Sequence, residues 1–281
     1  MTEINSIGPS RELPIGIFDS GMGGLTVLRT LRARLPRESF RYLGDTARLP
    51  YGTKGADTIT RYALQAAGLL VARDIKLVVV ACNTASAVAM PALAHAFAPL
   101  PVIGVVETAA AAAVGASRSG HIAVLATEST VRGGAYERAI CARRADARVF
   151  SQACSLFVAL AEEGWTRGPL VEAIVREYLQ PVLGERKRDG LDCVVLGCTH
   201  FPLLGETIAG VAGTGIHVID PSEPVAEAVQ AVLNARDLYC GAKFAGSTQF
   251  FATDDVERFA RVGGRFLGTA IAAADVERVD L

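Results

Sequence analysis

Short unbroken runs of apolar residues alternate with longer segments of mixed composition along most of the chain. Strands buried on both faces of a parallel sheet take this form, rather than a strict apolar and polar alternation. The runs lie at residues 15–18, 40–43, 77–80, 102–105, 122–125, 148–150, 193–196 and 217–219. The segments between them favour helices, for example at residues 24–34, 57–73, 108–114 and 170–183. This order predicts the α/β class with mostly parallel sheets.

One strand and the polar residues after it occur twice. KLVVVACNT, which begins at Lys76, lines up with DCVVLGCTH, which begins at Asp192. A weaker echo relates IGIFDSGMGG at Ile15 to IAVLATESTVRGG at Ile122. We therefore expect two similar α/β domains related by pseudo-symmetry, each of which supplies one cysteine from the same structural position.

The two domains are expected to interleave along the chain. The first is predicted to comprise residues 13–107 together with 220–281, and the second residues 108–219. Residues 1–12 carry two glutamates and lack the continuous apolar region of a secretory signal. They are predicted to be a disordered leader.

Composition excludes several classes of protein. The chain has 281 residues, 51% of them hydrophobic, which is enough for a sizeable core. Its net charge of −1 lacks the basic excess that binding to nucleic acid requires. The most apolar stretch, residues 77–116, is interrupted by polar residues and three prolines, so no membrane span is expected.

The cysteines point to chemistry rather than to a structural framework. Six are present without a CxxC pair, so neither a disulfide scaffold nor a zinc ribbon is predicted, and a cytoplasmic location is expected. Cys82 and Cys198 each follow a predicted strand, where the loops of a parallel sheet form the functional crevice. A lone thiol is usually an inert core residue. The duplicated setting favours a function for these two, and the other four are interpreted as core residues: Cys141, Cys154, Cys193 and Cys240.

Polar residues beside the two cysteines are candidates to stabilise a thiolate or to bind a ligand. Asn83 and Thr84 follow the first cysteine, although Thr84 is also a candidate helix N-cap. Thr199 and His200 follow the second, and His200 is a candidate proton partner at neutral pH. Asp19 either caps the next helix, binds a substrate ammonium group or orients Cys82.

Two further segments are expected near the crevice. Pro50, Tyr51 and Gly52 form a predicted turn whose tyrosine borders it. The glycine turn at residues 21–24 partly matches a dinucleotide-binding motif, but its last position is Thr26. A nucleotide-binding oxidoreductase therefore stays open as an alternative function.

Four motifs, taken together in this order and spacing, resemble those of the bacterial glutamate racemases. They are Asp19-Ser20-Gly21, Pro50-Tyr51-Gly52, Cys82-Asn83-Thr84 and Gly197-Cys198-Thr199-His200. The resemblance extends from about Ile15 to the end of the chain. It implies two α/β domains with the active site in the cleft between them, and no pyridoxal phosphate, metal or nucleotide cofactor. The implied reaction interconverts L- and D-glutamate and supplies D-glutamate for peptidoglycan.

The resemblance also assigns roles to individual residues. Cys82 is implied to take the α-proton from D-glutamate and Cys198 from L-glutamate, with help from Asp19 and His200. The implied substrate-binding residues are Asp19, Ser20, Pro50, Tyr51, Gly52, Asn83, Thr84, Thr199 and His200. The family has a further glutamate near Glu162, but its flanking prolines are replaced here by Ser155 and Ala159, so Glu162 and Glu163 both stay candidates. A homodimer is compatible with the family, although no surface pattern in the sequence indicates one.

Racemisation fits the residues without the family name, because it needs one proton carrier on each face of the substrate. A positioned base contributes about 10²–10⁴-fold, so donors that stabilise the developing negative charge must supply the rest. A racemase of the same superfamily that acts on aspartate or hydantoins is the nearest alternative, and His200 disfavours it. A related decarboxylase would need one thiol, and a periplasmic binding protein would need none.

Overall fold

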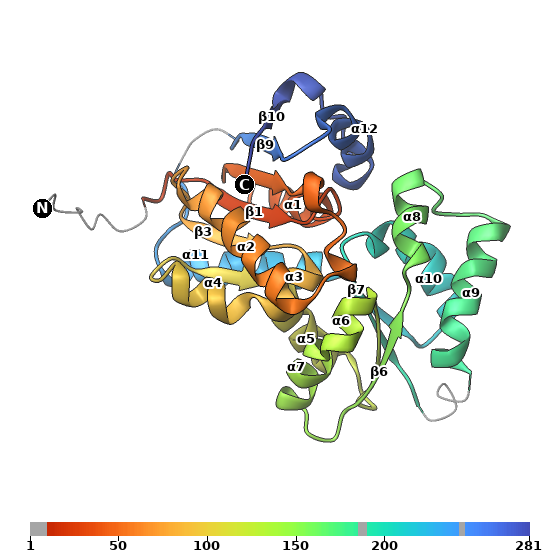
Figure 1. The fold of residues 1–281 in the computed structure, drawn as a ribbon. Helices are drawn as coiled ribbons and strands as arrows, with labels where there is room; N and C mark the ends of the chain where they lie inside the picture. The colour runs from red at the N-terminus through yellow and green to blue at the C-terminus, as the bar shows by residue number, and fades with distance from the viewer. Residues whose placement is uncertain (1–9, 185–189, 242–244) are drawn as a thin grey trace, which may run out of the picture.

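The computed structural model describes residues 10–184, 190–241 and 245–281, which form two parallel β-sheets with helices packed around them (Figure 1). The first sheet contains β1 (Ile15–Asp19), β2 (Phe40–Gly44), β3 (Leu77–Val80), β4 (Val102–Gly104), β9 (Thr248–Ala252) and β10 (Val276–Arg278). The second contains β5 (His121–Ala126), β6 (Arg148–Ala153), β7 (Cys193–Gly197) and β8 (His217–Ile219). All strand pairs recorded in the two sheets are parallel. The predicted α/β class with parallel sheets is confirmed.

The strand order confirms the internal duplication. The first sheet runs β10-β9-β2-β1-β3-β4 and the second β6-β5-β7-β8. The four strands of the second sheet therefore match β2-β1-β3-β4 one for one. In this match β5 corresponds to β1 and β7 to β3, the same pairs of segments that resemble each other in sequence.

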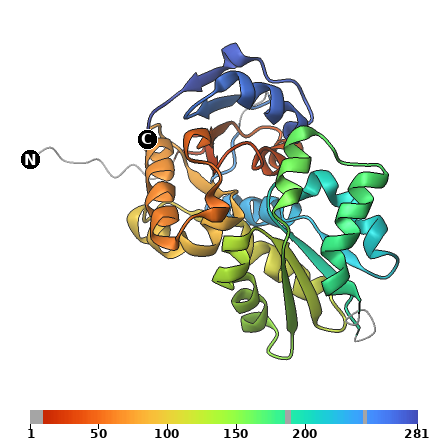
Figure 2. The ribbon, with the colours of Figure 1, turned by 45° about the vertical axis from the view of Figure 1, so that its right-hand side comes forward.

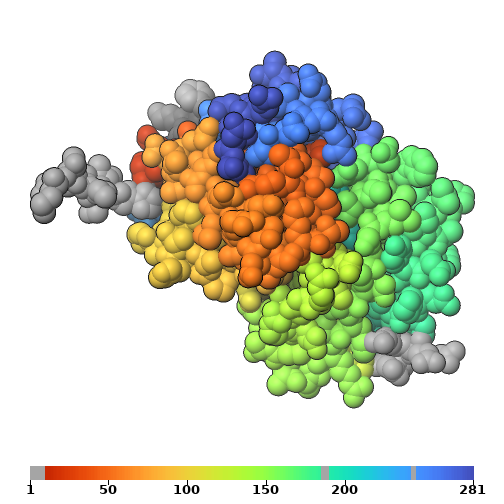
Figure 3. Space-filling view, viewed as in Figure 1, coloured from red at the N-terminus to blue at the C-terminus, as the bar shows by residue number. Residues whose placement is uncertain are grey.

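Helices cover the sheets and join the two halves. They are α1 (Leu25–Arg34), α2 (Ala56–Val71), α3 (Asn83–Val88), α4 (Met90–Ala96), α5 (Val105–Ala116), α6 (Glu128–Gly133), α7 (Ala135–Arg143), α8 (Leu156–Glu163), α9 (Pro169–Leu183), α10 (Gly205–Ala212), α11 (Ser222–Ala235) and α12 (Val256–Leu267). At the junction α5 packs against both α11 and α7. In Figure 2 the green segments of the second sheet's half lie below and to the right of the first half. In Figure 3 the surface of this half adjoins that of the other.

Each sheet separates two hydrophobic cores, because successive strand residues point to opposite faces. In β3, Leu77 and Val79 join one core while Val78 and Val80 join the other. All four residues are buried, which explains why this strand appears in the sequence as an unbroken apolar run.

The sequence missed two strands, and several predicted boundaries differ from the observed ones by one to three residues. β9 and β10 add to the edge of the first sheet, and their exposed polar residues hide them from a search for apolar runs. The run predicted at residues 102–105 ends as a strand at Gly104, and Val105 begins α5. The extra strands bring α12, which lies between them in the chain, onto this half of the molecule (Figure 1).

The start of the described chain is held in place by a buried ion pair. Most of the leader predicted at residues 1–12 lies outside the described residues, but Ser10 accepts a backbone hydrogen bond from Leu13. The ammonium group of Lys76 pairs with Glu38 and donates to the carbonyl of Arg11. Among the described residues, no helix has the length and apolar character needed to cross a membrane. The limits of the two domains stay a prediction.

Candidate active site

Four strand ends of the two sheets come together where the halves meet. Ser20 follows β1 and Cys82 lies just beyond β3, while Thr127 and Cys198 follow the corresponding strands β5 and β7. In both sheets these two strands are neighbours, and the strand order runs in opposite directions on either side of the pair. Crevices at such points are the usual ligand sites of open parallel sheets.

A cavity of about 300 Å³ opens at this junction, near the lower end of the range for small-molecule sites, roughly 300–1,000 Å³. Its lining consists of Ser20, Gly21, Leu49, Pro50, Gly52, Thr53, Thr127, Glu128, Ser155, Val158, Ala159, Glu162 and His200. Five predicted site residues are among them. The others are buried and do not line the cavity: Asp19, Tyr51, Cys82, Asn83, Thr84, Cys198 and Thr199.

Cys82 lies in a buried and negatively charged setting. It is the N-cap residue of α3, and its thiol lies 3.5 Å from the Ser20 hydroxyl. Burial raises the pKa of Cys82 to about 12, and the negative charge of Asp19 adds to the shift. Burial and the charge of Asp19 therefore both favour the protonated thiol of Cys82.

Two polar atoms near Cys82 are buried without a hydrogen-bond partner among the described residues. Asp19 accepts a bond from the Gly21 backbone through Oδ2, at 3.0 Å, but its Oδ1 has no partner. Asn83 accepts one from the Tyr136 hydroxyl at 2.5 Å, but its Nδ2 is unpaired. Buried polar groups are rarely left unpaired in native proteins, so one acceptor and one donor are free for a ligand.

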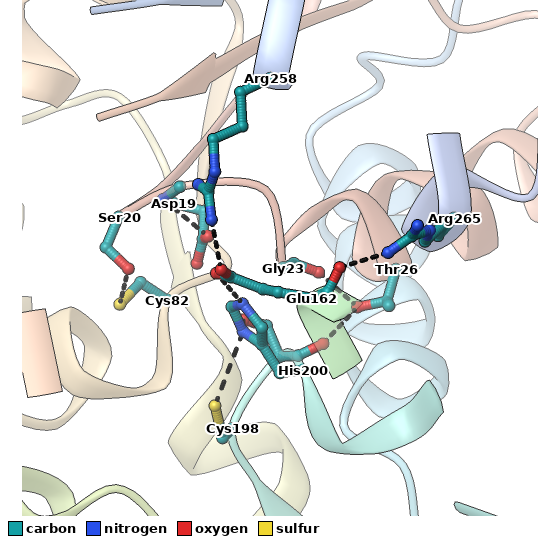
Figure 4. A network of polar contacts seen from close by, with 12 residues as sticks. Asp19, Ser20, Gly23, Thr26, Cys82, Glu162, Cys198, His200, Arg258 and Arg265 are labelled. Carbon is teal, nitrogen blue, oxygen red and sulfur yellow. Dashed lines mark hydrogen bonds and ion pairs between the residues drawn. The ribbon is translucent and has the colours of Figure 1, made fainter. Parts of the chain in front are cut away.

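Cys198 lies beside a chain of charged groups (Figure 4). Nδ1 of His200 is 3.9 Å from its sulfur, and Nε2 of the same ring is 3.1 Å from Oε1 of Glu162. Burial opposes the charged imidazolium, but the bonds to Cys198 and Glu162 outweigh it and raise the pKa of His200 to about 10. Burial also disfavours the Glu162 carboxylate, yet His200 and Arg258 together lower its pKa.

Tyr51 supports the cavity without lining it. Its ring is buried, and its hydroxyl donates to Asp45, which also accepts bonds from Arg48 at 2.7 Å and Thr253 at 3.0 Å. This network fixes η2 (Tyr51–Thr53) and so brings the neighbouring Pro50 and Gly52 to the cavity wall. The sequence placed the tyrosine itself at the border of the crevice, and the structure puts its ring in the layer behind the cavity wall.

Thr84 is not a helix N-cap, contrary to one interpretation of the sequence. Cys82 occupies that position, and the Thr84 hydroxyl instead bonds those of Thr127 and Thr130, at 3.1 and 3.2 Å. The bond to Thr127 joins the first half to the second directly at the cavity.

Side chains of the protein occupy the space beside the glycine turn at residues 21–24. A Cβ atom on Gly23 would lie 2.2 Å from Oγ1 of Thr199 and 2.5 Å from Nδ1 of His200. The hydroxyl of Thr26, which broke the dinucleotide motif, lies within hydrogen-bond distance of the carbonyls of Gly23 and Thr199. Gly23 therefore lets the loop after Cys198 approach the end of β1, a packing role that needs no nucleotide.

Glu162 and Glu163 differ clearly in position. Glu162 lines the cavity and bonds His200, whereas Glu163 is exposed. Sequence reasoning missed Thr127, although the echo between the segments at Ile15 and Ile122 aligns it with Ser20. It also missed Arg258, for which no local signal exists.

Two related α/β halves thus meet at one cavity, and each carries a cysteine at the corresponding strand end. The chain belongs to the Asp/Glu/Hydantoin racemase family, whose pattern it matches over residues 25–231. It is 44% identical over 268 residues to the glutamate racemase of Syntrophus aciditrophicus, a match that covers 95% of this chain and 97% of the relative.

The solved structures that this chain resembles include those of glutamate racemases. The glutamate racemase from Francisella tularensis in complex with D-glutamate matches with a TM-score of 0.88 at 34% identity, covering 96% of this chain and 98% of that one. The glutamate racemase from Thermus thermophilus in complex with β-chloro-D-alanine matches with a TM-score of 0.85 at 42% identity, covering 97% and 98%.

Proposed function

We propose that the protein interconverts L- and D-glutamate by a two-base mechanism without a cofactor, and that it supplies D-glutamate for peptidoglycan synthesis. The observation that carries the proposal is the placement of two thiols. Cys82 and Cys198 come from corresponding strand ends of two related halves. Their sulfurs lie 3.5 Å from Ser20 and 3.9 Å from His200, two residues that line the same small cavity. The names of the relatives support glutamate as the substrate.

In the direction from L to D, Cys198 acts as the base. The His200 imidazolium, whose Nδ1 is 3.9 Å from the sulfur, stabilises the Cys198 thiolate as an ion pair. The thiolate takes the α-proton of L-glutamate, and the electron pair of the broken bond delocalises into the α-carboxylate. The Cys82 thiol then gives its proton to the opposite face of the same carbon. Turnover leaves Cys198 protonated and Cys82 as the thiolate, the state required for the reverse reaction.

The unpaired atoms near Cys82 suit an amino acid. Asp19 Oδ1 is an acceptor for the substrate ammonium group, and Asn83 Nδ2 is a donor for a carboxylate oxygen. A bound ammonium group beside Asp19 offsets the negative charge that raises the pKa of Cys82. Substrate binding thereby favours ionisation of this thiol to the thiolate that takes the α-proton of D-glutamate.

The implied contacts divide between cavity wall and supporting layer. Ser20, Pro50, Gly52 and His200 line the cavity, so we assign them direct contact with substrate. Tyr51 is assigned the role of holding the cavity loop through Asp45. Thr84 and Thr199 lie beside the two thiols, and we assign them to the ends of the bound amino acid.

A circular-dichroism assay of the purified protein, treated with chelator and without added cofactor, tests this function. Each glutamate enantiomer is expected to lose its optical activity, and in D₂O deuterium is expected to enter Cα from both sides. Aspartate and hydantoins serve as competing substrates in the same assay. Failure to racemise glutamate, or preference for one of the competitors, would overturn the substrate assignment.

Three expectations about the whole molecule accompany this function. We place the boundaries of the domains at residues 107/108 and 219/220, supported by the strands that each sheet contains. The free state of all six cysteines supports a cytoplasmic location. A homodimer is proposed because three large apolar side chains are exposed on or between α8 and α9: Leu156, Trp165 and Leu170. Light scattering of the protein and of a Trp165→Ser, Leu170→Ser variant tests the dimer.

A further inference from the structure

The C-terminal helix of the first half reaches across to the chain of charges beside Cys198. Arg258, in the first turn of α12, donates to Oε2 of Glu162 at 2.7 Å. Arg265, nearly two turns further along α12, donates to the backbone carbonyl of the same glutamate. In Figure 4, Arg258 approaches the Glu162 carboxylate from the side opposite His200, and Arg265 approaches the backbone end of Glu162 from the right. One residue of the second half is thus held by two residues of the first.

Glu162 uses a different oxygen for each partner. Oε1 lies 3.1 Å from Nε2 of His200, and Oε2 pairs with Arg258. The side chain of Glu162 is 16% exposed and that of His200 11%, so both are largely shielded from water. A carboxylate bonded at both oxygens is fixed in rotation as well as in position.

We propose that Arg258 is a positioning residue for the base Cys198, which acts by holding the Glu162 carboxylate against His200. This inference rests on the proposed two-base function and assigns part of it to a helix that does not line the cavity. Among the described residues, Glu162 is the one recorded ion-pair partner of Arg258.

Local structure explains why Glu162 needs an external anchor. α8 has eight residues, and Glu162 is its penultimate one. The helix ends at Gly164, whose φ of +78° is the left-handed conformation that glycine adopts readily. The last turn of a short helix frays easily and gives a long side chain little restraint. Arg265, which packs against Gly164, and Arg258 supply that restraint from α12.

The positive charge of Arg258 supports the same role as its hydrogen bond. The groups that face Glu162 are His200 and Arg258, and those that face His200 are Cys198, Asp19 and Glu162. Without Arg258, burial would oppose the ionised form of Glu162 more strongly, and His200 would lose part of the charge that keeps it an imidazolium. The Cys198 thiolate would then have a weaker partner.

Replacement of Arg258 by alanine is expected to lower kcat/KM about tenfold, the loss of one charge-assisted hydrogen bond. The fall must be equal for both enantiomers, because the equilibrium constant of racemisation is one. Arg258→Lys should restore part of the rate. Arg261→Ala is the matched control, since Arg261 is an exposed residue of the same helix without a recorded bond to any described residue. It should leave the rate unchanged.

The α-deuterium isotope effect on kcat/KM separates positioning from mere support of the fold. If Arg258 serves Cys198 alone, abstraction from L-glutamate becomes the slowest step in Arg258→Ala, and the isotope effect from L-glutamate grows. Abstraction from D-glutamate by Cys82 becomes a rapid earlier step, so the effect from D-glutamate shrinks. A rate equal to that of the native protein, or a slower one with unchanged isotope effects in both directions, would overturn the proposal.

A crystal structure of Arg258→Ala tests the positioning without reference to any substrate. We expect the Glu162 carboxylate to have left His200 Nε2. A carboxylate that keeps its 3.1 Å contact overturns the role of Arg258 even if the enzyme acts on another amino acid. Conversely, a native protein that fails to racemise glutamate overturns the proposed substrate and leaves this structural result to decide the role of Arg258.

Discussion

Cys82 and Cys198 occupy the same position in two matching sheets, but the chain after each one differs. Cys82 is followed at once by the helix α3, whereas Cys198 is followed by a turn and then η3 (Phe201–Leu204). A negative charge, that of Asp19, acts on the first thiol, while the second has the His200 imidazolium beside it. The duplicated fold therefore supplies two equivalent positions, and the loops give them opposite electrostatic settings.

This difference suits a pair of thiols that must hold one proton between them. At neutral pH the burial of Cys82 and the charge of Asp19 favour its thiol. On the other side the pKa of His200 is raised, so a positive charge lies 3.9 Å from the sulfur of Cys198. A symmetric site would leave both cysteines in the same state, with either no base or no acid.

Replacement of either thiol should have the largest effect on racemisation. Cys82→Ser and Cys198→Ser should each lower racemisation by at least about 10²–10⁴-fold, because a serine hydroxyl is a far weaker base than a thiolate. Each variant should still eliminate a leaving group from Cβ of one enantiomer of a glutamate analogue, and the two variants should choose opposite enantiomers. Cys240→Ser, a change outside the cavity, is the control. Racemisation at the native rate in either variant would disprove the two-base model.

The sequence predicted the matching positions of the two cysteines better than the different charged residues that surround them. The unbroken apolar runs located β3 and β7, and the repeat of strand, small residue and cysteine located both thiols. Adjacent residues of a helix point about 100° apart, so only tertiary contacts could select Glu162 over Glu163. Arg258 lies 96 residues from Glu162 and joins it through α12, which follows a strand that the apolar pattern did not reveal.

Removing the negative charge near Cys82 should make the two thiols more alike. In Asp19→Asn the pKa of Cys82 is expected to fall below its value of about 12, because the repulsive charge is gone. Activity should nevertheless fall roughly 10²-fold, since removing one partner of a buried charge pair costs about 2–5 kcal/mol. Thiolate absorbance across a pH titration measures the first effect and the racemase assay the second. Subtracting the titration of an Asp19→Asn, Cys82→Ser double variant isolates this thiol, and an unchanged pKa would show that burial alone sets it.

A smaller effect on stability tests the charges on the Cys198 side. The pKa of Glu162 is lowered in the folded protein, so the ionised carboxylate stabilises the fold above its ordinary pKa of 4.5. That contribution is lost as the pH falls below 4.5 and through the lowered value. Glu162→Gln should therefore be less stable than the native protein by about 1–2 kcal/mol at pH 7, and the difference should shrink toward pH 4.

Urea unfolding of both proteins between pH 4 and pH 7 measures this difference. Glu163→Gln is the matched control, because the neighbouring glutamate is exposed and should change stability little at any pH. A Glu162→Gln deficit that stays constant with pH would mean that packing, rather than charge, holds α8 against α12. The imidazolium beside Cys198 would then owe less to Glu162, and the electrostatic contrast between the two thiols would rest on Asp19 alone.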